Sequence, residues 1–174
     1  MDKTKDSGNA RKHETTVERK SDRELVVTRT FNSPAQLVFA AWTKPELIKR
    51  WWMPKSCGIP FLECEMDART GGSYRFVFRH PESGEPMPFF GKYVEVIPNS
   101  RLVWTNEEAD ENGSVTTVTF EEKGGETLVV MRDLYPSKKA LDDAIASGST
   151  SGSGEQFEQL DQLLAAAGAS VEPS

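Results

Sequence analysis

The stretch from Gly71 to His80 reads GGSYRFVFRH, and it carries the pattern on which the predicted fold rests. Its three aromatic residues, Tyr74, Phe76 and Phe78, alternate with arginine and valine. Successive side chains of a β-strand point to opposite faces of a sheet, so this alternation predicts a strand with one aromatic face. The turn-rich segment HPESGEPMP that follows ends the strand.

Similar β-rich segments occur on both sides of this strand. They are RELVVTRTF (23–31), IPFLECEMD (59–67), FFGKYVEVI (89–97), RLVWTNE (101–107), SVTTVTFEE (114–122) and ETLVVMRDL (126–134). Two short helices are predicted after the first strand, at 32–43 and 43–52, and an amphipathic helix at 155–168. The order β-α-α-β6-α predicts an α+β helix-grip fold, in which a curved antiparallel sheet wraps around the long C-terminal helix.

Composition divides the chain into three predicted parts. Residues 1–22 contain one branched aliphatic residue and no aromatic residue, so we expect a disordered tail. Residues 23–168 form one predicted domain, and residues 169–174 a disordered C-terminus. The Gly/Ser run at 147–155 is interpreted as a flexible hinge into the last helix.

Charge and residue counts exclude several classes of function. The net charge is -6 and no dense Lys/Arg run occurs, which argues against nucleic acid as a partner. Two cysteines cannot build a structural zinc site, and no apolar run is long enough to cross a membrane. We expect a soluble, reduced, cytoplasmic protein without a metal or cofactor, as a monomer or weak dimer.

Four segments together resemble a known family. They are SPAQLVFAAWTKPELIKRWWMP, DARTGGSYRFVF, FFGKYVEVIPNSRLVWT and GEQFEQLDQLLA. They are similar to the bacterial Hsp90-ATPase-activator-homologue-like (AHSA1-like) proteins of the START/Bet v 1-like (SRPBCC) helix-grip superfamily. The resemblance runs from about residue 23 to residue 168 and implies a cavity between sheet and helix, used by different members for unrelated roles.

Residues of the usual catalytic kinds are few. His13 lies in the predicted tail and His80 at a strand end, and no GxSxG, GxGxxG or HExxH motif occurs. Glu95 is the one notable acid, because period two places it on the same side of its strand as Tyr93. If that side faces the cavity, Glu95 is either a polar anchor for a ligand, an acid/base, or half of a structural ion pair with Arg75 or Arg132.

Large aromatic rings are the strongest functional signal. They suit either a packed core or a pocket for an apolar or aromatic ligand. The predicted cavity residues are Trp52, Met53, Phe76, Phe78, Tyr93, Glu95, Trp104, Phe120, Phe157 and Leu160. Adjacent residues on a helix point about 100° apart, so we expect Trp51 in the core and Trp52 at the cavity mouth.

Three functions remain open from the sequence. The first is a non-enzymatic binding protein that holds a small apolar or aromatic ligand between the sheet and the last helix. The second is a cyclase- or hydrolase-like enzyme that uses the same cavity with Glu95, Tyr93 or Arg75. The third is a module that interacts with a chaperone or a regulator protein in a stress response.

Overall fold

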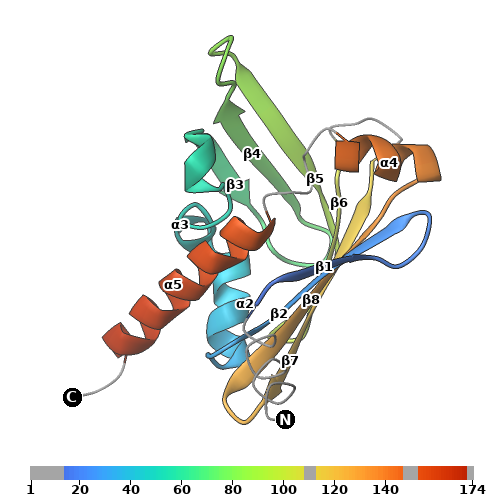
Figure 1. Ribbon diagram of the computed structural model, residues 1–174. Helices are drawn as coiled ribbons and strands as arrows, with labels where there is room; N and C mark the ends of the chain where they lie inside the picture. Colours follow the sequence, from blue (N-terminus) through green and yellow to red (C-terminus); the bar gives the residue numbers. More distant parts are fainter. Residues whose placement is uncertain (1–13, 108–112, 147–152, 172–174) are drawn as a thin grey trace, which may run out of the picture.

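The computed structural model describes residues 14–107, 113–146 and 153–171, and their backbone forms one curved antiparallel sheet with helices against it (Figure 1). The strands are β1 (Thr16–Arg19), β2 (Glu24–Phe31), β3 (Phe61–Met66), β4 (Ser73–Arg79), β5 (Pro86–Ile97), β6 (Arg101–Thr105), β7 (Val115–Lys123) and β8 (Glu126–Leu134). The helices are α2 (Ala35–Thr43), α3 (Pro45–Ile48), the 3-10 turn η1 (Lys55–Cys57), α4 (Lys138–Ala146) and α5 (Ser153–Val171). The predicted α+β class is therefore confirmed.

The sheet order is β1-β2-β8-β7-β6-β5-β4-β3, and all neighbours are antiparallel. The seven predicted strands correspond to β2–β8, each within a few residues of its expected bounds. Helices α2 and α5 contact each other, and both contact the sheet, where α5 touches β2 and α2 touches β7 and β8. Phe31, Phe157 and Leu160 are fully buried at this junction, which is the centre of the core.

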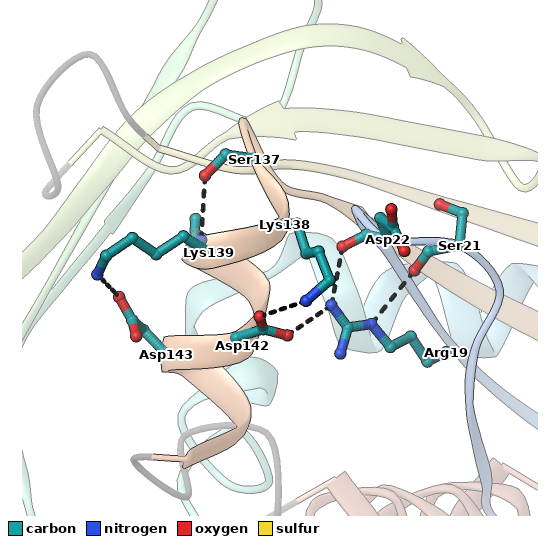
Figure 2. Close-up of polar contacts among 9 residues, drawn as sticks. Arg19, Ser21, Asp22, Ser137, Lys138, Lys139, Asp142 and Asp143 are labelled. Carbon is teal, nitrogen blue, oxygen red and sulfur yellow. Dashed lines mark hydrogen bonds and ion pairs between the residues drawn. The ribbon is translucent and has the colours of Figure 1, made fainter.

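The prediction of a disordered tail up to residue 22 is wrong for its last part. Thr16–Arg19 is strand β1, which pairs with β2 at the edge of the sheet. Arg19 also forms an ion pair with Asp142 of α4, at 2.7 Å between Nη2 and Oδ1, and donates to the backbone carbonyl of Asp22 at 2.9 Å (Figure 2). Composition did not show this strand because its side chains are exposed and its stability comes from backbone pairing.

Two further differences concern helices. Helix α4 was not predicted; Leu141 is its fully buried residue, and Lys138 and Lys139 pair with Asp142 and Asp143 one turn later (Figure 2). Helix α5 continues to Val171, so the predicted disordered C-terminus from residue 169 starts too early. The predicted hinge falls largely on 147–152, outside the described residues.

Two negative findings apply to the described part of the chain. Its helices include none that is long and apolar enough to span a membrane. Its His, Cys, Asp and Glu side chains form no group of three that could hold a metal ion.

Candidate functional site

A cavity of about 150 Å³ lies between the sheet and the short helices. Strands β4, β5 and β6 form one wall, and α2, α3 and the loop after α3 form the other. The lining residues are Trp42, Ile48, Trp52, Met53, Tyr74, Phe76, Phe78, Phe89, Tyr93, Trp104 and Asn106. Six of the ten predicted cavity residues are among them, namely Trp52, Met53, Phe76, Phe78, Tyr93 and Trp104.

The aromatic alternation in β4 builds the sheet wall. Tyr74, Phe76 and Phe78 are all buried on the same face. Gly91 lies opposite Tyr74 on β5, and a Cβ there would meet the Thr105 carbonyl oxygen at 1.9 Å. The glycine therefore lets the backbones of β5 and β6 approach closely beside the cavity.

The two adjacent tryptophans occupy different environments, as expected. Trp51 is fully buried, packs edge-on against Trp42 with 4.8 Å between ring centroids, and donates its indole N–H to the Ala41 carbonyl at 2.9 Å. Trp52 is half-buried, packs edge-on against Phe76 at 5.9 Å and lines the cavity. Trp51 thus belongs to the core and Trp52 to the cavity wall.

Glu95 does not face the cavity, which corrects the prediction made from period two. The pairing of β5 with β6 shifts between Tyr93 and Glu95, and such an irregularity breaks the alternation of side chains. The Glu95 carboxylate is almost half exposed and pairs with Arg101 at 2.8 Å. Glu95 pairs with neither of the two arginines predicted for it, because Arg75 pairs with Glu63 and Arg132 with Glu24.

Phe120, Phe157 and Leu160 are buried but do not line this cavity. Phe120 packs edge-on against Phe39 at 5.4 Å, and Phe157 against Phe31 at 5.6 Å. All three belong to the packed core, where the rings of Phe120 and Phe157 also lie edge-on against Trp42.

The polar groups of the cavity are neutral. Burial raises the pKa of the Tyr93 hydroxyl far above its usual value of 10, with smaller contributions from Cys64 and Asp67, so the phenol stays protonated. Tyr74 donates its hydroxyl to the Thr105 carbonyl at 2.8 Å and lies 3.3 Å from the Asn106 amide oxygen. The indole N–H of Trp42 is buried and meets no acceptor among the described residues.

Next to these polar groups lies the buried carboxyl group of Asp133, which the sequence analysis did not predict. The Asn106 amide nitrogen donates to the Thr116 hydroxyl at 3.0 Å, and Thr116 donates to Asp133 at 2.5 Å. Burial raises the pKa of Asp133 to about 6, although the hydrogen bond from Thr116 opposes the rise. A lone aspartate in a β-rich segment was the available sequence signal.

Gln159 is the other residue that the sequence analysis missed. Its amide oxygen accepts from the Lys55 backbone N–H at 2.7 Å, and its amide nitrogen donates to the carbonyls of Trp51 and Met53, both at 3.1 Å. Gln156 donates to the carbonyl of Trp52. Helix α5 therefore holds the backbone of the loop whose side chains line the cavity. A polar residue that borders an apolar helical stripe is the signal that could have indicated it.

An antiparallel sheet curved around a C-terminal helix, with an aromatic cavity inside, defines the helix-grip class of START/Bet v 1-like (SRPBCC) proteins. Within it, residues 32–165 match the family described as Activator of Hsp90 ATPase homolog 1-like protein, and the chain belongs to that family. No curated protein matches the chain.

Solved structures of bacterial proteins share this fold. A protein from Rhodobacter sphaeroides is 27% identical with a TM-score of 0.79, and the match covers 88% of this chain and 99% of that one. A protein from Nitrosomonas europaea is 25% identical with a TM-score of 0.77, covering 87% and 99%. An AHSA1-like protein from Aeromonas hydrophila, 18% identical with a TM-score of 0.65 over 86% and 98%, shows the fold alone.

Proposed function

We propose that this protein binds a small apolar or aromatic ligand in the cavity without transforming it. The observation that carries the proposal is the hollow of about 150 Å³ with aromatic walls. Cavities of this size in apolar surroundings stay dry and accept a benzene-sized molecule. Trp52, Phe76, Tyr93 and Trp104 would contact the ligand through their rings.

The character of the lining supports binding over chemistry. Its residues include no Asp, Glu, His, Lys or Arg, and its two phenols are neutral donors. Of the three groups named for the enzyme hypothesis, Glu95 and Arg75 lie outside the cavity in exposed ion pairs, and Tyr93 lines it. An interaction with a chaperone or a regulator stays a prediction.

The test is a titration with benzene, toluene, indole and naphthalene, followed by heteronuclear NMR of the backbone and the tryptophan indoles. We expect saturable shifts at Trp52, Phe76 and Tyr93 for the smaller rings. In Trp52→Ala, the widened cavity should favour naphthalene over benzene relative to the wild type.

Val94→Ala is the matched control, because Val94 is 54% exposed on the strand that carries Tyr93. It should leave all four affinities unchanged. Shifts that do not saturate, or that spread evenly over the surface, would remove the basis for a binding function.

A further inference from the structure

A second recess opens beside the cavity and carries positive charge. It has a volume of about 600 Å³ and lies between the end of α3 and the start of β3. Lys49, Arg50 and Lys55 line it together with apolar residues, among them Met53 and Phe61. We call this recess the cationic groove.

Three exposed cations line the groove. None of them has an ion-pair partner within the described residues, and all three are exposed. Several other basic residues do pair with acids, among them Arg29 with Glu158, and the exposed lysines of α4 with Asp142 and Asp143. An unpaired cluster of this kind is notable in a chain of net charge -6.

One acid near the groove, Glu155, is hydrogen-bonded to Ser56. Glu155 accepts from the Ser56 backbone N–H at 2.9 Å and from the Ser56 hydroxyl at 2.5 Å. These hydrogen bonds lower the pKa of Glu155, so the acid is ionised at neutral pH and engaged by Ser56. Two other recesses of the described surface contain carboxylates, Glu107 in one and Glu65 with Asp67 in the other, so the groove differs from them in charge.

The groove and the cavity share a thin apolar partition. Met53 lines both recesses. Phe61 lines the groove, and its ring lies 5.6 Å from Phe76 and 4.3 Å from Phe78, which line the cavity. Methionine is unbranched and adapts its shape at little cost, so a shift of the Met53 side chain can join the two spaces.

Size and charge together define the ligand. The cavity alone holds about one aromatic ring or a short acyl chain, so a larger molecule extends past Met53 into the groove. There it meets three cations. We propose that the ligand is an amphipathic acid, with its apolar end in the cavity and its carboxylate against Lys49, Arg50 and Lys55. This inference rests on the proposed binding function and adds the chemical class of the ligand.

The experiment compares two probes that differ in one group, 4-phenylbutanoate and 4-phenylbutan-1-ol. Tryptophan fluorescence gives the affinities, and methyl NMR of Met53 reports the passage into the cavity. The carboxylate of the acid would be attracted by three exposed cations, each with the strength of an exposed ion pair. We therefore expect the acid to bind about three- to tenfold more tightly than the alcohol at low salt. In 1 M NaCl the preference should largely vanish.

The charge variant is Lys49→Gln/Arg50→Gln/Lys55→Gln, whose sites are exposed, and circular dichroism verifies its fold. It should bind both probes equally, with the affinity for the alcohol unchanged. Lys92→Gln/Lys123→Gln/Lys139→Gln removes the same charge outside the groove and should keep the preference for the acid. This control distinguishes the effect of the groove cations on binding from the effect of the overall charge of the protein.

Each contrary outcome has a distinct meaning. Equal affinities of the wild type for acid and alcohol, with shifts at Met53, overturn the amphipathic acid and leave the binding function intact. A preference for the acid that persists in the groove variant, or that occurs without a shift at Met53, overturns it as well. Absence of binding by both probes and by the neutral rings contradicts the binding function itself.

Discussion

Replacement of Gln159 by leucine tests whether α5 holds the cavity loop in place. Gln159 is 8% exposed and makes three hydrogen bonds, to the backbone N–H of Lys55 and to the carbonyls of Trp51 and Met53. Leucine has a similar volume and keeps the apolar contacts of the helix. It leaves the three backbone groups without these partners.

The magnitude follows from the number of bonds. A hydrogen bond contributes about 0.5–1.5 kcal/mol net, and a buried group left without a partner costs about 1–3 kcal/mol. The loop is partly exposed, so water replaces some of the lost partners. We expect the free energy of unfolding to fall by about 2–4 kcal/mol, a large part of the roughly 5–15 kcal/mol typical of a domain.

Urea unfolding measures this loss, and hydrogen exchange of the Lys55 amide locates it. Gln162→Leu is the matched control, since Gln162 lies one turn further along α5 and is exposed. Its effect should stay within about 0.5 kcal/mol. If Gln159→Leu were no more destabilising than Gln162→Leu, or if exchange at Lys55 were unchanged, the loop would be held by its side-chain packing and not by α5.

Trp51→Ala should lower the free energy of unfolding in urea by about 3–5 kcal/mol. Trp52→Ala should lower it by clearly less and change ligand affinity more. The reverse order of the two effects would refute the assignment of Trp51 to the core and Trp52 to the cavity wall. Glu95→Gln should change stability by less than about 1 kcal/mol and leave binding unaltered, because its pair with Arg101 is exposed; a lost ligand signal would return Glu95 to the site. Burial raises the pKa of Asp133 from 3.8 to about 6, so the folded state holds this proton more tightly than the unfolded chain. Stability should therefore fall as the pH rises from about 4 to 6, and Asp133→Asn should flatten that slope and stabilise the protein at pH 7 by on the order of 3 kcal/mol; a less stable variant at pH 7 would show that the carboxylate is needed.

Side-chain periodicity predicted most of the fold because most strands are buried on one face. In β4, the alternation of aromatic and other residues matches the observed burial of Tyr74, Phe76 and Phe78. The same logic, applied at 100° per residue, separated Trp51 from Trp52. Where burial on one face decides the structure, the sequence contains the signal.

The errors occurred where stability has another source. Strand β1 buries no side chain and is held by pairing with β2 and by the ion pair of Arg19 with Asp142. Glu95 was misplaced because the irregularity between Tyr93 and Glu95 depends on the register with β6, which period two along one strand does not contain. Both errors concern pairing between strands, which the pattern along a single segment does not contain.

The distinction between lining and filling rings shows why a site is harder to predict than a fold. Phe76 and Phe120 both alternate correctly and are both 5% exposed, yet Phe76 lines the cavity and Phe120 fills the core beside Phe39. Periodicity gives the face of a strand and not the distance of a residue from the gap that the helices leave open. Trp42 belongs to both sets, because it lines the cavity and its ring also lies 6.0 Å from the ring of Phe120. Met53 lines both the cavity and the groove, so the size of the cavity and the charge of the groove together bear on which molecule the protein can hold.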